Sequence, residues 1–122
     1  ENPTKSVEDL QKGLSEIFNK DISVIISDSM TRPYRSGITN FAISSSNLPS
    51  LLDLKGKKDM YGNILRGTEV AIADELAAAA GLLMGQSKES KPVILIKGFI
   101  KGKNDINNAF DLTVNENEDL YR

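Results

Sequence analysis

Residues 24–35 of the chain read VIISDSMTRPYR, where a β-branched apolar run gives way to an acidic residue and two arginines follow within seven residues. The run Ile22–Ile26 predicts a buried strand, because it is rich in β-branched residues and too short for a helix. Asp28 would then lie at the end of that strand, beside Arg32 and Arg35. A carboxylate next to two guanidinium groups is suited to hold a metal ion and a phosphate group.

Pro33 and Gly37 predict that residues 27–37 form a loop, because proline restricts the residue before it and glycine frees the chain. An aspartate at a strand end is most often a turn or capping residue, which is one interpretation of Asp28. In the other, Asp28 and the Ser29 hydroxyl are oxygen ligands of a hard cation. The two arginines are equally open: they bind a carboxylate or phosphate, or they are ordinary surface ion-pair partners.

The composition limits the kinds of metal and catalytic site that the chain can form, because the 122 residues contain neither cysteine nor histidine. Disulfides, thiolate zinc sites, histidine triads and imidazole ligands are therefore excluded. Any metal must bind oxygen ligands, which favours magnesium, manganese or calcium. An apolar content of 39% suffices for one modest core, so we expect residues 1–122 to form a single domain.

The net charge of −2 offers no basic footprint for nucleic acid and no polybasic patch for a membrane surface. No run approaches the roughly 20 consecutive apolar residues that a membrane span needs. The lack of cysteine is compatible with a reducing compartment. We therefore expect a cytoplasmic protein with no nucleic-acid or membrane partner.

The apolar spacing along the rest of the chain predicts an α+β fold. Helical periodicity indicates an amphipathic helix over residues 6–20 and an alanine-rich helix over residues 68–84 that is buried on most sides. Alternating or β-branched residues predict further strands at 38–44 and 93–96, with a long irregular region over residues 44–66 between. We expect a mixed sheet packed with the two main helices.

Two polar features of the second helix need an explanation. Asp74 and Glu75 interrupt its most apolar part, and adjacent helical positions lie about 100° apart, so we expect one to be exposed and the other paired. A salt bridge is the preferred account over a catalytic role.

Gly85 is placed to end the helix, and the polar loop after it offers amides and hydroxyls to a phosphate, a weak indication by itself. The glycines match neither a Walker loop nor a dinucleotide fingerprint.

Several motifs occur in a fixed order over nearly the whole chain: Ile25–Ser29 with Arg32–Arg35, Asp53–Gly56 with Asp59 and Gly62, Ala73–Ala80 leading to Met84–Gly85, and Glu118–Arg122. In this order the chain resembles the C-terminal half of the F420-0:gamma-glutamyl ligase family. The resemblance implies a GTP-dependent ligase that adds L-glutamate to the deazaflavin coenzyme F420 precursor through an acyl phosphate. It also implies magnesium or manganese, potassium as a further candidate cation, and an intertwined homodimer. In such a protein, a dimer partner or a missing N-terminal half would complete the sheet.

The resemblance also implies roles for residues at matching positions. Asp28, Ser29 and Gln86 match metal ligands, with Ser29 in the place of a threonine ligand to a second metal. Arg32 and Arg35 are candidate catalytic residues. The nucleotide-contacting loop corresponds to Met84, Gly85, Gln86, Ser87, Lys88, Glu89, Ser90 and Lys91.

The chain departs from the family pattern at three places. Ser29-Met30-Thr31 replaces Thr-Phe-Gly, Tyr34 replaces tryptophan, and residues 44–47 (SSSN) replace a Gly-Ala-Gly segment. Thr31 disfavours the positive φ that glycine allows, so we expect an altered loop and, with it, an open choice of acceptor. The alternative hypothesis is a non-catalytic nucleotide- or anion-binding dimerisation module. Without an N-terminal half, we expect the isolated chain to be inactive.

Overall fold

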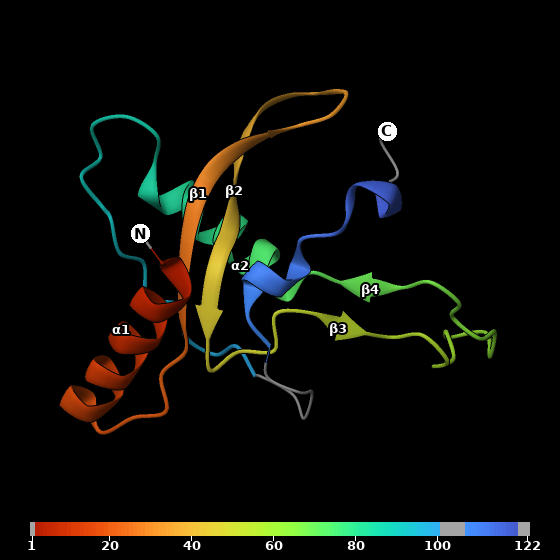
Figure 1. Cartoon of the computed structure of the whole chain (residues 1–122), viewed down its shortest axis with the longest axis horizontal. Coiled ribbons are helices and arrows are strands. Elements are labelled where there is room, and N and C mark those ends of the chain that lie inside the picture. The colour runs from red at the N-terminus through yellow and green to blue at the C-terminus, as the bar shows by residue number, and fades with distance from the viewer. Residues whose placement is uncertain (1, 101–106, 120–122) are drawn as a thin grey trace.

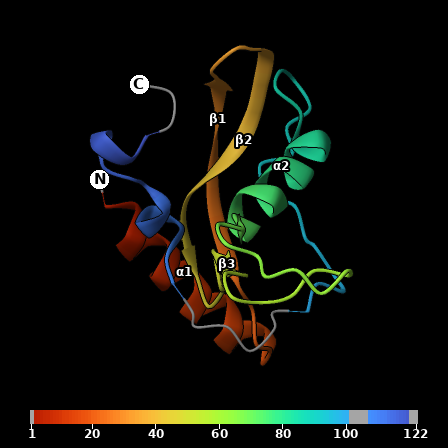
Figure 2. The ribbon, with the colours of Figure 1, turned by 90° about the vertical axis from the view of Figure 1, so that its right-hand side faces the viewer.

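A computed structural model describes residues 2–100 and 107–119, and it shows a long hairpin with one helix on each face (Figures 1 and 2). The α+β class and the two main helices are confirmed. The elements are α1 (Pro3–Phe18), β1 (Val24–Arg32), β2 (Arg35–Ser46), β3 (Leu52–Asp53), β4 (Glu69–Val70), α2 (Ile72–Met84), and the 3₁₀ turns η1 (Ala109–Leu112) and η2 (Glu116–Glu118). Within the described ranges, no helix has the length and apolar character that a membrane crossing requires.

The central hairpin is longer than the sequence predicted, and the expected loop over residues 27–37 is wrong. β1 continues through this region to Arg32, and the chain turns only at Pro33 and Tyr34 before β2 begins at Arg35. Tyr34 takes a φ of 56° at the turn, so the positive φ falls on this residue and not on Thr31. Polar residues continue the strand because an antiparallel pair can leave one face to solvent.

The expected mixed sheet is realised as two separate antiparallel pairs, β1 with β2 and β3 with β4. Within the described residues, parallel pairing is present as an isolated bridge between Pro49 and Asn107. The Asn107 side chain accepts the Ser50 amide (2.7 Å), and Asn108 Oδ1 accepts the Ser44 hydroxyl (2.9 Å) and the Ser45 amide (3.2 Å). The segment before η1 is thereby attached to the end of β2.

The core is small and is built mostly from short side chains. Leu48, Ala73 and Ala109 form its centre, and half-buried neighbours from β1, β2, α2 and η1 pack on it: Ile25, Ala42, Leu76 and Leu112. The alanines allow α2 to approach the hairpin closely. The expectation that α2 is buried on most sides is wrong for its C-terminal turn, where Leu82 is 87% exposed.

Both helix starts differ from the predicted positions. α1 begins at Pro3, because the Asn2 side chain accepts the Lys5 amide (3.2 Å) and caps the helix before Ser6. α2 begins at Ile72, because residues 69–70 pair with β3. Each start lies three or four residues from the predicted position, because sequence patterns are least informative at the ends of helices.

The predicted strand at residues 93–96 is absent, and Val93 and Leu95 lie exposed in irregular backbone. A β-branched run forms a strand only against a partner strand, and none of the described strands pairs with this one.

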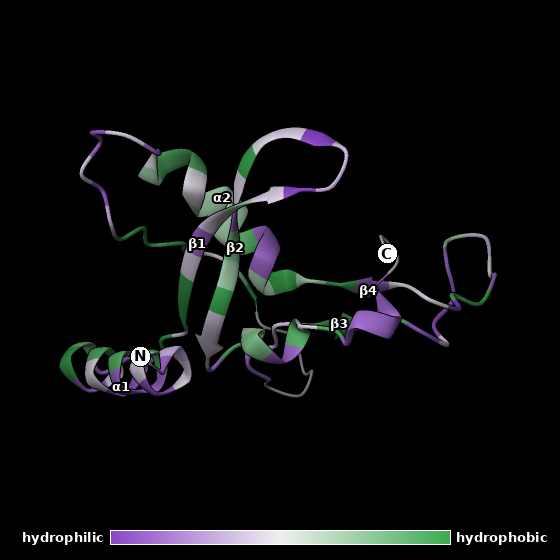
Figure 3. Cartoon of the chain, turned by 45° about the horizontal axis from the view of Figure 1, so that its top comes forward, coloured by the Kyte–Doolittle hydropathy of each residue, from purple (hydrophilic) through white to green (hydrophobic). Residues whose placement is uncertain are grey.

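Residues 52–70 form an arm that projects from the body, in place of much of the irregular region predicted for 44–66 (Figures 1 and 3). Beyond β3 and β4 its two sides remain hydrogen bonded, from the Leu54 amide to Thr68 (3.0 Å) and from the Gly56 amide to Leu65 (2.8 Å). The far end of the arm carries the exposed apolar side chains of Met60 and Ile64. Figure 3 shows hydrophobic colouring on part of the ribbon there.

Candidate functional site

One face of the central hairpin packs against α2, and it carries Ser29 and Asn40 directly opposite each other. Asn40 is only 8% exposed, and its Nδ2 atom contacts the sulfur of Met84 at the end of α2 (3.9 Å). Two residues further along β2, the Ala42 amide donates to Asp74 Oδ1 (2.9 Å) in the first turn of the helix. These contacts place the C-terminal end of α2 over the Ser29 side of the hairpin.

Gln86 is brought to the same side of the molecule. Its Nε2 atom donates to Asn40 Oδ1 (2.9 Å), which ties the loop after α2 to the middle of β2. The structure thus places two predicted ligands, Ser29 and Gln86, on either side of Asn40. Asn40 was not among the residues predicted from the sequence. The signal was present, because an asparagine within the strand ITNFAI needs a hydrogen-bond partner if it is buried.

Asp28 is placed differently from the prediction, because it lies within β1 and not at its end. It stands opposite Phe41, and successive strand side chains point to opposite faces, so its carboxylate is directed away from the Ser29 face. Asp28 is exposed, and its Oδ1 atom accepts the amide of Ser29 (2.7 Å). Among the described residues, no group of three or more acidic side chains lies close together.

The two candidate arginines close the hairpin at its turn, where Arg32 and Arg35 are paired across the strands. Arg32 Nη2 donates to the Ser36 carbonyl (3.5 Å), and its Nη1 atom is covered without a hydrogen-bond partner in the part of the chain that the structure describes. Like charges directly opposite each other destabilise a strand pair. An anion between the two guanidinium groups would relieve that repulsion and give the unpartnered nitrogen an acceptor.

The loop after α2 is folded around a carboxylate. Glu89 accepts the Ser87 amide (2.9 Å), and this bond, with one from its own backbone amide, lowers the pKa of Glu89 below its ordinary value. Gly85 takes a φ of 75°, and a Cβ there would lie 2.3 Å from the Glu89 carboxyl carbon. Gly85 is therefore required both by the backbone and by the carboxylate packed on it.

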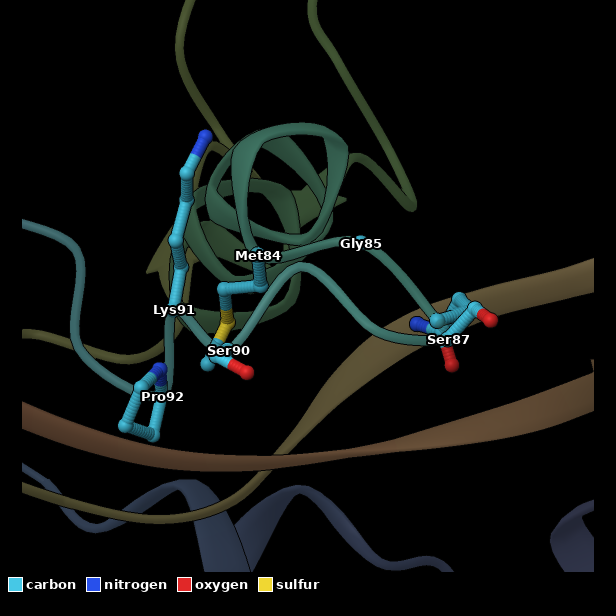
Figure 4. Close-up of a pocket in the computed structure, with 7 residues that line it drawn as sticks. Met84, Gly85, Ser87, Ser90, Lys91 and Pro92 are labelled. Atoms are coloured by element: carbon cyan, nitrogen blue, oxygen red, sulfur yellow. The ribbon is translucent and has the colours of Figure 1, made fainter.

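An open, shallow pocket of about 580 Å³ lies beside this loop (Figure 4). Lys91 extends alongside the end of α2, while Ser87 lies on the far side of the loop (Figure 4). Six of the eight residues predicted to contact a nucleotide line the pocket together with Pro92: Met84, Gly85, Gln86, Ser87, Ser90 and Lys91. The other two, Lys88 and Glu89, lie in the same loop and are exposed.

As predicted, one residue of the acidic pair has a partner and the other is exposed: Asp74 accepts a hydrogen bond, and Glu75 faces solvent. The partner of Asp74 is the backbone amide of Ala42, however, and the predicted salt bridge is not what holds it. Asp74 therefore attaches the start of α2 to β2, which assigns it a structural role.

The family model described as F420-0:Gamma-glutamyl ligase matches residues 1–98, which include the hairpin, α2 and the pocket loop. The chain belongs to the F420-0:gamma-glutamyl ligase family. Three proteins named coenzyme F420:L-glutamate ligase are similar to this family member over 99% of its length. The identity is 45% for the protein of Methanococcus maripaludis strain C7, 42% for that of Methanocaldococcus jannaschii and 34% for that of Archaeoglobus fulgidus.

The match covers 48% of each of these three relatives, so the chain spans about half the length of the ligases it resembles. In this ligase family member, all the candidate residues lie within the matched range: the hairpin positions 28, 29, 32 and 35 and the loop over residues 84–91.

Proposed function

We propose that this chain supplies one side of the catalytic site of a ligase that joins L-glutamate to a coenzyme F420 precursor, with GTP as co-substrate. The family assignment and the relatives' names support glutamate ligation. The observation that carries the proposal is the hydrogen bond from Gln86 to Asn40, because it places the pocket loop against the hairpin face that bears Ser29.

The oxygen donors fit a hard cation such as magnesium or manganese. Ser29 lies on one face of the hairpin, and Gln86, whose Oε1 atom has no hydrogen-bond partner among the described residues, is attached to that face through Asn40. Asp28 is directed to the other face, so the donors suit two separate cation positions better than one. Bound cations would neutralise charge on the phosphate oxygens of GTP. Potassium is a further candidate for the same oxygen donors.

The reaction divides into two balanced steps. A carboxylate oxygen of the deazaflavin acceptor attacks the γ-phosphorus of GTP, and the bond to GDP breaks to give an acyl phosphate. The glutamate amine then attacks the acyl carbon, phosphate leaves with the bonding electron pair, and the amine loses a proton. Such transfer depends mainly on positioning and on stabilising charge, which residues other than histidine and cysteine can supply.

This chain's own residues have distinct parts in that scheme. Arg32 and Arg35 hold anionic oxygen at the hairpin turn, where Arg32 has a nitrogen without a partner among the described residues. The loop over residues 84–91 contacts the nucleotide, with Lys91 beside the pocket and the Ser87 amide available once it is released from Glu89.

A second candidate function is a non-catalytic nucleotide- or anion-binding dimerisation module. Exposed apolar side chains favour it, since Leu82 and Leu83 on α2 and the run from Val93 to Leu95 are suited to be covered by another chain. A homodimer or a separate N-terminal half would bury the same surface.

The two candidates are separated by mixing the chain with GTP, Mn²⁺, L-glutamate and the F420 precursor, with and without the N-terminal half of the Methanococcus maripaludis relative. We expect glutamylated product by mass spectrometry only when the half is present. Gln86→Leu should then lower turnover by about 10²–10³-fold, as loss of a charge-stabilising group does. Glu8→Gln, an exposed position on α1, is the control. GTP binding without product in any mixture would favour the binding module.

A further inference from the structure

We propose that Asn40 is a positioning residue, which orients the side-chain amide of Gln86 so that its oxygen, and not its nitrogen, faces a bound cation. The inference rests on the proposed function, because it assumes that Gln86 is a ligand. It concerns a residue that no cation would touch, and it follows from the hydrogen bonds around the end of α2.

The two ends of a glutamine amide have nearly the same shape and opposite hydrogen-bonding character. Gln86 Nε2 donates to Asn40 Oδ1 at 2.9 Å, so the nitrogen end is held against the hairpin. Turning the amide over would bring two acceptor oxygens together. The oxygen Oε1 is therefore the end left for a cation, and the nitrogen, which would repel one, is kept away.

Asn40 can perform this role because its own amide is fixed. The side chain is buried between the hairpin and α2, and its Nδ2 atom is directed to the Met84 sulfur (3.9 Å), which leaves Oδ1 toward Gln86. Ser29 stands across the strand from Asn40 on the same face. Asn40 therefore neighbours both of the residues that would bind the same cation, Gln86 through a hydrogen bond and Ser29 across the strand pair.

Gly81 makes room for this arrangement. A Cβ at Gly81 would lie 2.6 Å from Asn40 Oδ1 and 2.7 Å from its Cγ. The nearest atoms belong to the amide group, and Asn40 Cβ follows at 3.2 Å, so Gly81→Ala should push the Asn40 amide away from Gln86. The spectrum of the variant reports whether it remains folded. Gly13 is the matched control, because it is also a helical glycine and nothing lies within 4 Å of the Cβ that alanine would add.

The first measurement needs no metal. In the ¹⁵N spectrum of the whole chain, the Gln86 side-chain NH₂ protons should exchange slowly with solvent, because one of them is bonded to Asn40. Asn40→Leu, which removes the acceptor, and Gly81→Ala should both increase that exchange rate. The exchange rate should stay unchanged in Asn40→Asp, which keeps an acceptor oxygen, and in Gly13→Ala. Equal exchange in all five proteins would overturn the proposal.

The second measurement is a Mn²⁺ titration that follows paramagnetic broadening of the Gln86 and Ser29 signals. Loss of an outer residue that orients a ligand typically costs 10–100-fold in metal affinity. We expect Asn40→Leu to raise the half-broadening concentration about tenfold or more, Gly81→Ala to raise it less, and Asn40→Asp to restore it. Gly13→Ala should leave it unchanged.

The controls distinguish the failure of this inference from that of the proposed function. If Gln86→Leu abolishes broadening at Ser29 while Asn40→Leu and Gly81→Ala leave it unchanged, Gln86 is a ligand and the positioning role is wrong. If Gln86→Leu changes nothing, the metal role of Gln86 fails, and the positioning role fails with it. Should Asn40→Leu not fold, which the spectrum itself reports, Gly81→Ala decides the same question.

Discussion

The chain contains two antiparallel hairpins that are stabilised in different ways. The central pair, β1 and β2, has a helix on each face (Figure 2) and carries four of the candidate residues, at positions 28, 29, 32 and 35. The arm over residues 52–70 projects from the body, and its contacts are mostly its own: backbone bonds, the ion pair of Lys55 with Glu69 (2.7 Å), and a tip folded around Asp59. Two strands alone are marginally stable in water. Burial holds the first hairpin, and local hydrogen bonds hold the second.

Removing core volume beneath the central hairpin should have the largest effect. Leu48 is 2% exposed at the centre of the core, so Leu48→Ala should lower the free energy of unfolding by roughly 2–5 kcal/mol. Met60→Ala at the tip of the arm, where Met60 is 87% exposed, should change it by no more than about 0.5 kcal/mol. Urea unfolding measures both. Similar losses for the two variants would remove the distinction between the hairpins.

The turn of the central hairpin should matter for activity and little for stability. Arg32→Gln removes a cation from the Arg32–Arg35 pair, and we expect turnover in the reconstituted ligase to fall about 10²–10³-fold with the midpoint of unfolding unchanged or raised. The matched change in the arm is Arg66→Gln, at an exposed position. We expect it to leave turnover unaltered. Equal losses of turnover in the two variants would mean that removing any positive charge lowers turnover, wherever the arginine lies.

The smallest expected effect is a local loss of order at low pH. The side chain and amide of Asn63, then the amide of Tyr61, lower the pKa of Asp59, and the Ser87 amide lowers that of Glu89. Because both folded-state pKa values are depressed, the ionised carboxylates stabilise the tip of the arm and the loop after α2 at neutral pH. This stabilisation is lost as the pH falls through the two pKa values. Amide shifts of Tyr61 and Ser87 should report midpoints below the ordinary values of about 3.9 and 4.3.

Asp59→Asn provides the control for that titration. It should abolish the movement of the Tyr61 amide and leave the Ser87 midpoint in place, because the two carboxylates belong to separate regions. A Ser87 midpoint at or above the ordinary glutamate value would contradict the loop geometry.

Local patterns were enough to predict the existence of both helices and the end of α2. Helical spacing predicted α1 and α2, and Gly85 ends α2 where the sequence indicated. The irregular backbone after α2 was also predicted, because a polar stretch follows a strong helix there, while its contact with a nucleotide stays a prediction.

What could not be predicted depends on contacts between distant residues. β1 passes through Asp28 because β2 pairs with it, which no local pattern contains. Asn40 belongs to the site only because α2 packs against it and Gln86 donates a hydrogen bond to it. Gln86 lies 46 residues further along the chain. The run from Val93 to Ile96 has strand composition without a described partner, so composition alone was misleading there.

The attachment of Asn108 to the end of β2 has a consequence for the order of folding. Its side chain bonds to Ser45 across 63 residues of sequence, and closing a loop of that size costs more entropy than closing the β1–β2 turn. We therefore expect this contact to form after the local β1–β2 turn, because the entropy of closing the long loop must be lost before the contact can stabilise the fold. The hairpin face that bears Ser29 and Asn40 can therefore assemble with α2 before η1 docks.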